Sequence, residues 1–244
     1  PKAGKSVFTR HLALAVAKGE PFLGREVKQG QVLYLAIEEP HGKVKSSFRK
    51  LGLTEDVPLK LKFDKPDSHS VDDLRLIVRA EKPILVVIDT VTRMPKGKFD
   101  LNDYMRNSEW LDPYLYMAHE EGVTIIVNYH SSRNGRLLEG SDSIASPLGS
   151  VGIIATPDQI IAIKVESDET RSFSSVGRYE SVPQTLLAFD RGTERLSVIG
   201  EKSEITHVRL REAIVDILDV DKWKKHADVL EAVSGNAKEK LNAL

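Results

Sequence analysis

The segment Gly4-Lys5-Ser6 has the residue types and spacing of a phosphate-binding loop. It matches the end of the pattern Gly, four residues, Gly, Lys, then Ser or Thr, whose first Gly would precede Pro1. A helix that starts here points free N–H groups and the positive end of its dipole at phosphates. Lys5 would contact the β- and γ-phosphates and Ser6 would bind Mg²⁺. A chance tripeptide is the alternative, and the motifs that follow make it the weaker one.

A carboxylate that follows a buried strand is the second candidate. Asp89 ends the apolar run Ile84–Ile88. In an open parallel sheet the carboxyl ends of the strands line the ligand crevice, and an Asp there typically holds the Mg²⁺ of a bound nucleotide. An Asp that only caps a turn is the alternative.

Two adjacent glutamates are candidates for the base that activates water. Glu38 and Glu39 follow the apolar run that ends at Ile37. Hydrolysis of a phosphoanhydride needs a group that orients a water in line with the γ-phosphate. We assign this role to Glu38 and keep Glu39 in reserve, because Glu-Glu-Pro-His-Gly is also a solvated turn sequence.

A third apolar run, Val123–Val127, is followed by Asn128-Tyr129-His130. A polar side chain at that strand end would lie beside Asp89 and could contact the γ-phosphate. A surface histidine with no ligand is an equally simple interpretation of His130.

The elements that must position these residues alternate between strand and helix. Apolar runs predict buried strands and periodic segments predict helices between them, which favours a parallel sheet with right-handed crossovers. After residue 157 the pattern changes to strands joined by hairpins. In chain order, the expected segments are Ser6–Lys18, Gln31–Ile37, His41–Leu51, Leu59–Phe63, Val71–Ala80, Ile84–Asp89, Asn102–Glu121 with a possible break at Pro113, Val123–Asn128, Gln159–Val165, Arg171–Val176, Thr185–Phe189 and Arg195–Ile199.

Composition narrows the class of protein. The 244 residues include 35 Lys plus Arg against 36 Asp plus Glu, so any nucleic-acid surface must be local. The absence of Cys excludes disulfides and thiolate metal sites and fits a cytoplasmic location. The apolar runs are too short to cross a bilayer, so we expect no membrane association.

The order of these motifs resembles that of RecA-like P-loop ATPases, and most closely the RepA-like replicative helicases of plasmids, phages and other mobile elements. The resemblance covers nearly the whole chain. It rests on Pro1–Ser6, Leu33–Glu38, Val87–Asp89, Asn128–Arg133, the Gly- and Ser-containing stretch Leu148–Ile161, and the hairpin Arg171–Arg178.

This resemblance implies ATP and Mg²⁺ as ligands and assembly of identical subunits into a ring or filament. The nucleotide site would then lie between subunits, where a neighbour's basic side chain stabilises the transition state. Arg178 matches that role best, while Arg133 and Arg136 are as easily explained by a solvated loop. The sequence differs from the family pattern in two ways. The strand that comes before the phosphate loop in the family would lie upstream of Pro1. No Arg directly precedes Gly140-Ser141 or Gly149-Ser150.

The candidate residues fall into three groups. The catalytic residues are Glu38, Lys5 and Arg178; the nucleotide contacts are Lys2, Ala3, Gly4, Lys5, Ser6, Val7 and His130; and the Mg²⁺ ligands are Ser6 and Asp89.

The chain divides into an expected core, residues 1–203, and a helical tail, residues 204–244. Thr206–Leu218 is periodic, with Leu210, Ile214, Ile217 and Leu218 on one side. With the helices expected over Trp223–Val233 and Ala237–Leu244, it resembles part of a winged helix, a module that often binds DNA. A helical cap that packs on the core is the alternative.

The expected fold class is therefore α/β: a RecA-like core with a mostly parallel sheet, late β-hairpins and a winged-helix-like appendix. The expected function is an ATP-hydrolysing DNA motor or loader, with DNA-facing loops in Ser131–Ser146. A slowly hydrolysing switch that holds DNA or a protein partner is the rival. A small-molecule kinase is less favoured because no Arg-rich lid is evident.

Overall fold

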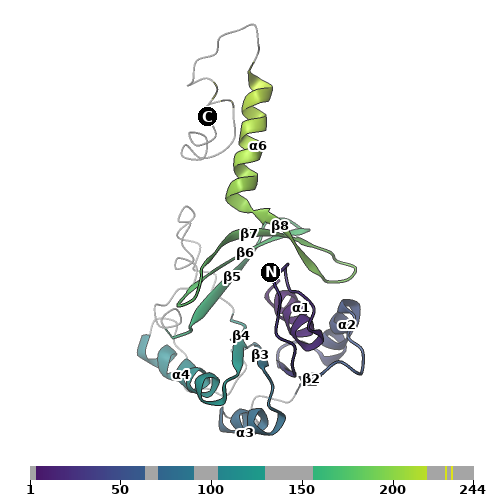
Figure 1. Ribbon diagram of the computed structural model, residues 1–244, viewed down its shortest axis with the longest axis vertical. Helices are drawn as coiled ribbons and strands as arrows, with labels where there is room; N and C mark the ends of the chain where they lie inside the picture. Colours follow the sequence, from purple (N-terminus) through teal and green to yellow (C-terminus); the bar gives the residue numbers. More distant parts are fainter. Residues whose placement is uncertain are drawn as a thin grey trace.

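A computed structural model gives the fold of the chain (Figure 1). It describes residues 4–63, 71–90, 104–129 and 156–218, together with Val229 and Ala232. In the segment 104–129 the side chains are described from Trp110 onward.

The first sheet is parallel, as the continuous apolar runs predict. Its strand order is β2-β1-β3-β4, and all three neighbouring pairs are parallel. Every residue of β1 and β3 is buried, because helices cover both faces. The strands are β1 (Val32–Ala36), β2 (Leu59–Lys62), β3 (Leu85–Asp89) and β4 (Thr124–Val127).

Four helices cover the two faces of this sheet (Figure 1). Alternate side chains of β1 and β3 point to opposite faces, which divides the core into two clusters. One cluster joins the strands to α1 and α2, and the other joins them to α3 and α4. The helices are α1 (Lys5–Lys18), α2 (His41–Leu51), α3 (Val71–Glu81) and α4 (Tyr104–Glu121).

The possible break at Pro113 does not occur. Helix α4 continues through Pro113 from Tyr104 to Glu121. A proline in a helix interior removes one backbone hydrogen bond and strains the preceding turn. The burial of Leu111, Tyr114 and Met117 on either side of Pro113 supplies packing that offsets this cost.

The second sheet is antiparallel and carries the predicted hairpins. It has the order β5-β6-β7-β8 and lies over α1, so that α1 is enclosed between the two sheets (Figure 1). The apolar contacts between α1 and this sheet are made by Phe8 and Ala15 against Leu187 and Leu196. The strands are β5 (Gln159–Val165), β6 (Thr170–Gly177), β7 (Val182–Phe189) and β8 (Leu196–Glu201).

The last described helix differs from its predicted limits. Helix α6 (Lys202–Ile217) begins four residues before Thr206, directly after β8, and the expected domain boundary at 203/204 falls inside it. Leu218 follows the helix and is 51% exposed, so its placement on the apolar face was wrong. Leu210, Ile214 and Val229 form a small cluster.

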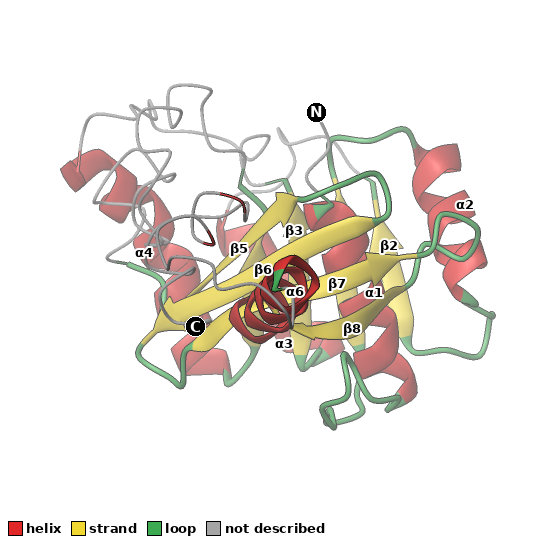
Figure 2. Ribbon diagram, turned by 90° about the horizontal axis from the view of Figure 1, so that it is seen from above, coloured by secondary structure: helices red, strands yellow, loops and turns green. Residues whose placement is uncertain are grey.

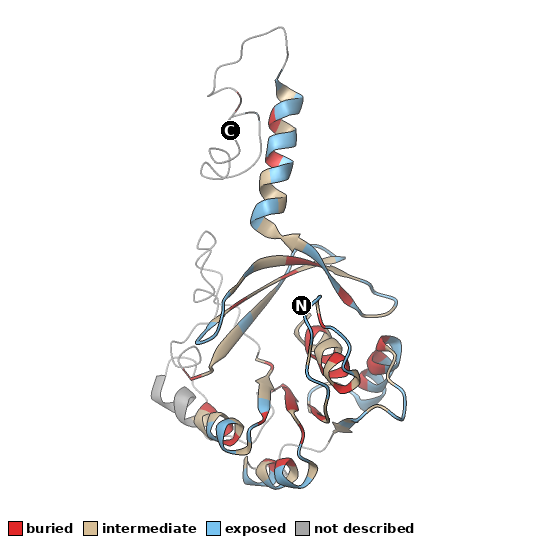
Figure 3. Cartoon of the chain, in the orientation of Figure 1, coloured by how far each residue is buried: buried red, intermediate tan, exposed pale blue. Residues whose placement is uncertain are grey.

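Helix α6 projects away from the second sheet, and Figure 2 shows it nearly end-on above the strands. Buried residues concentrate in α1, β1 and β3, whereas most of α6 is exposed or half-buried (Figure 3). Among the described residues, no helix has the length and apolarity that a bilayer crossing needs.

Candidate nucleotide site

The phosphate-loop residues lie at the start of α1. Gly4 is the N-cap, with φ 90° and ψ 7°, and α1 begins at Lys5. Gly4 has no side chain with which to cap this end of the helix, so the N-cap residue leaves the first N–H groups available. The Val7 side chain packs in the core between α1 and the second sheet, so any contact of Val7 with a ligand would be made by its backbone. Lys2 and Ala3 lie outside the described residues.

The two expected Mg²⁺ ligands face each other. The Ser6 hydroxyl donates a hydrogen bond of 3.1 Å to Oδ1 of Asp89, the last residue of β3. The side-chain amide of Asn128, which follows β4, donates to the same oxygen over 3.0 Å. Three segments far apart in sequence therefore converge at the carboxyl edge of the parallel sheet.

Sequence reasoning missed the partners of the other Asp89 oxygen. The Tyr34 hydroxyl donates to Oδ2 over 2.8 Å, and Nη2 of Arg10 lies 3.5 Å from it. Thr9 accepts a hydrogen bond of 3.0 Å from Asn128 and lies 3.3 Å from the Tyr34 hydroxyl. The polar residues Thr9 and Arg10, one turn after Lys5 and Ser6 on α1, were the available signal.

We call these five side chains the buried polar cluster. Each is at most 5% exposed. Buried polar groups must be hydrogen-bonded to offset their desolvation, and the cluster does so by surrounding one carboxylate with donors. Its members are Thr9, Arg10, Tyr34, Asp89 and Asn128.

The two candidate bases have different surroundings. Glu38 accepts a hydrogen bond of 2.9 Å from the Thr90 hydroxyl, next to Asp89. Glu39 forms ion pairs with Arg10 at 2.6 Å and with Lys43 at 2.5 Å. Burial acts to raise the pKa of Glu39, but the hydrogen bonds and charges of Lys43 and Arg10 outweigh it and hold the pKa below its ordinary value. Glu39 is thus a poor acceptor for a water proton, whereas Glu38 is an exposed carboxylate near Asp89.

Lys5 stands close to both carboxylates. Burial lowers the pKa of its ammonium, and the negative charges of Asp89 and Glu38 oppose that effect. A partly desolvated cation at a helix N-terminus gains the most from a multiply charged anion. The electrostatics of the site therefore favour a phosphate group beside Lys5.

The second sheet contributes a basic side chain that the sequence did not reveal in this place. A Cβ on Gly4 would lie 3.4 Å from Nε of Arg171. Nη1 of Arg171 donates to the backbone carbonyls of Ser167, Asp168 and Thr170, and the guanidinium lies 5.0 Å from the Phe189 ring centre. Arg171 is therefore held against Gly4, where the phosphate loop ends and α1 begins.

Arg178 lies elsewhere, just after β6. Its guanidinium pairs with Asp158 at 2.8 Å, and its side chain is 62% exposed. Asp158 also contacts Nε2 of His119 at 3.0 Å. An exposed arginine can change partners, so this geometry is compatible with a role toward another subunit and does not test it. His130, Arg133 and Arg136 lie outside the described residues.

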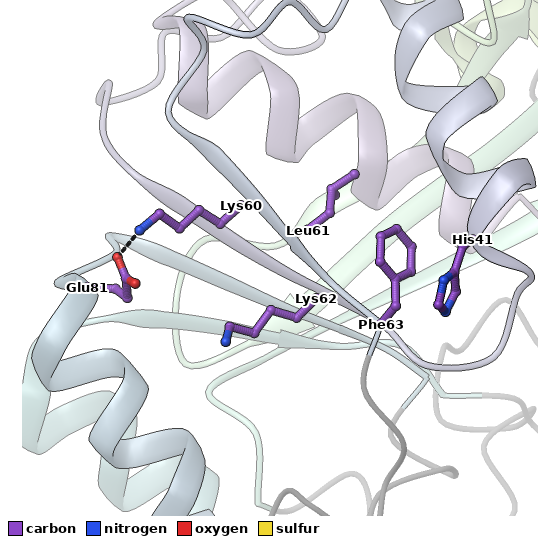
Figure 4. A pocket seen from close by; sticks show the side chains of 6 residues that line it. All are labelled: His41, Lys60, Leu61, Lys62, Phe63 and Glu81. Atoms are coloured by element: carbon purple, nitrogen blue, oxygen red, sulfur yellow. Dashed lines mark hydrogen bonds and ion pairs between the residues drawn. The ribbon is translucent and has the colours of Figure 1, made fainter.

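A hollow of about 510 Å³ runs along β2, at the edge of the sheet (Figure 4). Lys60 crosses it to pair with Glu81, and the rings of Phe63 and His41 lie against each other at 4.2 Å. Its lining includes no residue of the phosphate loop or the buried polar cluster. The hollow is therefore separate from the candidate nucleotide site at the start of α1.

The donor set fits a nucleotide with Mg²⁺. The uncapped helix start and left-handed Gly4 suit phosphate oxygens, and one hydroxyl beside one carboxylate suits a hard cation. When bound, Mg²⁺ would neutralise phosphate charge. Ser6 and Asp89 are the residues that would hold it, directly or through water.

Comparisons with known proteins give the family of the chain. The sequence profile of a family described as "AAA domain" matches residues 1–136. No curated protein sequence matches the chain significantly.

Two solved structures share the fold. One is of a DnaB-like replicative helicase, studied with its interactions with primase. It has a TM-score of 0.63 and 14% identity over 81% of this chain, and the match spans 56% of that helicase chain. The other is the ATPase domain of G40P, with a TM-score of 0.63, 17% identity and 81% of each chain covered. At these identities the likeness establishes a RecA-like fold.

Proposed function

The chain belongs to the AAA-domain family, and on that premise we propose that it is a RecA-like P-loop ATPase that hydrolyses ATP to act on DNA. The observation that carries the proposal is the convergence of Ser6, Asp89 and Glu38 beside Lys5 at the start of α1. A carboxylate–hydroxyl pair and a second, exposed carboxylate are the groups that phosphoryl transfer to water requires.

In the proposed reaction the free N–H groups of α1 and the Lys5 ammonium bind the β- and γ-phosphates. The other members of the buried polar cluster hold Asp89 in place, and Asp89 orients the Ser6 hydroxyl at the metal site. Glu38 accepts a proton from a water molecule as the water oxygen bonds to the γ-phosphorus. The bond from the γ-phosphorus to the bridging oxygen breaks, and the products are ADP and inorganic phosphate.

We further propose that the ATPase works as a DNA motor or loader of the replicative-helicase type, in a ring or filament of identical subunits. The fold it shares with a DnaB-like replicative helicase supports this, as does the resemblance to the RepA-like group of mobile elements. Arg178 would then leave Asp158 and complete a neighbour's site. The winged-helix-like tail would add contacts to DNA.

A slowly hydrolysing switch is the second candidate, and one observation favours it. Arg178 already has an ion-pair partner within its own chain, in Asp158. If that pair persists, no subunit receives Arg178 from its neighbour and turnover stays slow. Stimulation of turnover by DNA distinguishes a motor from a switch.

The test uses the full chain and the variants Lys5→Ala, Glu38→Gln and Glu39→Gln. Lys5→Ala should lose ATP binding, measured with a fluorescent nucleotide. Glu38→Gln keeps the size of the side chain and should bind ATP normally while hydrolysis falls by roughly 10²-fold or more, the scale for loss of a general base. Each is assayed with and without single-stranded DNA. Wild-type turnover in both variants would overturn the assignment, and a larger loss in Glu39→Gln than in Glu38→Gln would move the base to Glu39.

A further inference from the structure

Arg10 is a buried cation that joins three parts of the candidate site. Its side chain is 3% exposed, and it lies one helical turn after Ser6 on α1. Nη2 lies 2.6 Å from Oε2 of Glu39 and 3.5 Å from Oδ2 of Asp89. One guanidinium nitrogen thus contacts the segment after β1 and the end of β3 from a position on α1.

Burying the charge of Arg10 costs desolvation free energy, which argues against a side chain that only fills space in the core. A buried charge is tolerated only when partners offset its desolvation, and an apolar side chain of similar size would pack here at lower cost. Nε of Arg10 is buried and has no hydrogen-bond partner among the described residues. The contacts of Nη2 with the two carboxylates therefore explain the presence of Arg10 here, although not all of its N–H groups are hydrogen-bonded.

The contacts of Arg10 separate the two adjacent glutamates. Both oxygens of Glu39 are engaged, one by Arg10 and one by Lys43. The neighbouring Glu38 instead contacts Thr90, the residue after Asp89. The backbone N–H of Ile37 donates to the Asp89 carbonyl over 2.8 Å, so this segment is tied to β3 by the backbone as well.

We propose that Arg10 is a positioning residue for ATP hydrolysis: by holding Glu39 against α1 and Asp89, it presents Glu38 to the attacking water. This inference rests on the proposed ATPase function and explains why Glu38 rather than Glu39 acts as the base. A base must lie within hydrogen-bond reach of the water, and a misplacement of about 1 Å can reduce the rate by roughly 10²-fold. Arg10 acts through Glu39 and touches no reacting atom.

The test compares variants of Arg10 and of its partner in the full-length chain. Arg10→Met should lower kcat by about tenfold or more, within the range that small displacements produce, while KM and the directly measured nucleotide Kd change by less than about twofold. Arg10→Lys keeps a positive charge and should recover part of the lost kcat. The matched control is Lys43→Met, which removes the other donor to Glu39 and should change kcat by less than about twofold, because Lys43 is 47% exposed and exposed ion pairs contribute little.

A double variant shows whether the two residues act as one unit. Because Arg10 is proposed to act through Glu39, Arg10→Met combined with Glu39→Gln should be no slower than the slower single variant. Losses in kcat that multiply would overturn the proposal.

Two further outcomes are decisive. A folded Arg10→Met protein with wild-type kcat would reduce Arg10 to a structural residue. If Arg10→Met does not fold, Arg10→Lys and Glu39→Gln carry the test, and wild-type kcat in both would refute positioning. Failure of the ATPase proposal looks different, because wild-type protein would then hydrolyse no more ATP than Lys5→Ala.

Discussion

Replacing Tyr34 with Phe tests whether the buried polar cluster stabilises the fold through Asp89. The hydroxyl is fully buried and donates to Oδ2 of Asp89 over 2.8 Å. Tyr34→Phe removes that one donor and leaves the ring in its edge-on contact with Phe48. The change therefore creates almost no cavity.

The expected loss follows from the type of hydrogen bond. A bond to a charged acceptor contributes about 1.5–3 kcal/mol, and Arg10, at 3.5 Å from the same oxygen, replaces only part of it. Removing the phenol also removes its own desolvation cost. We expect a loss of about 2 kcal/mol in the free energy of unfolding, or a fall in Tm of roughly 4–8 °C for a chain of this size.

Urea unfolding followed by circular dichroism measures this loss, with Tyr114→Phe as the control. Tyr114 is also buried but belongs to the apolar cluster between α3 and α4. Tyr34→Phe should lower the urea midpoint without changing the slope m, and should lower it more than Tyr114→Phe does. Equal midpoints for wild type and Tyr34→Phe would refute the argument.

The stability difference also depends on pH in a defined direction. Burial, together with the charge of Asp89, raises the pKa of Tyr34 well above its ordinary value of 10.0. A group whose pKa is raised by folding stabilises the protein fully below its unfolded pKa and loses that contribution as pH rises toward the folded pKa. The advantage of wild type over Tyr34→Phe should therefore shrink above about pH 10.

Three further predictions concern the nucleotide site. Gly4→Ala should weaken ATP binding by about tenfold in a fluorescence titration. An alanine in the left-handed backbone conformation of Gly4 costs about 1–2 kcal/mol, and its Cβ would meet Arg171. Unchanged affinity would show that the loop can shift without cost. Asp89→Asn should raise the Mg²⁺ concentration for half-maximal turnover, because the charge beside Ser6 is lost, and an unchanged Mg²⁺ titration would contradict a metal role. A mixture of Arg178→Ala and Lys5→Ala subunits should regain turnover that neither variant has alone, because one subunit supplies the arginine and the other the nucleotide site. Turnover that does not depend on protein concentration, with no rescue on mixing, would exclude a shared site.

The local sequence was sufficient to predict the elements of the core. Apolar periodicity identified α2 with both ends and β5 with both ends, and placed the other core strands to within a few residues. Glycine and polar clusters marked where the elements stop. The start of α6 was missed because no loop separates it from β8: the strand ends at Glu201 and the helix begins at Lys202.

The sequence by itself predicted the kind of ligand, because Gly4-Lys5-Ser6 before a periodic segment and Asp89 after an apolar run follow the order of a nucleotide site. Only the tertiary structure decided which side chains surround Asp89, because Ser6 and Tyr34 meet it across 83 and 55 residues of chain. It also separated Glu38 from Glu39, a distinction that no local pattern contains. Adjacent residues at a strand end point toward different elements. Which elements Glu38 and Glu39 face depends on how the whole sheet packs against α1.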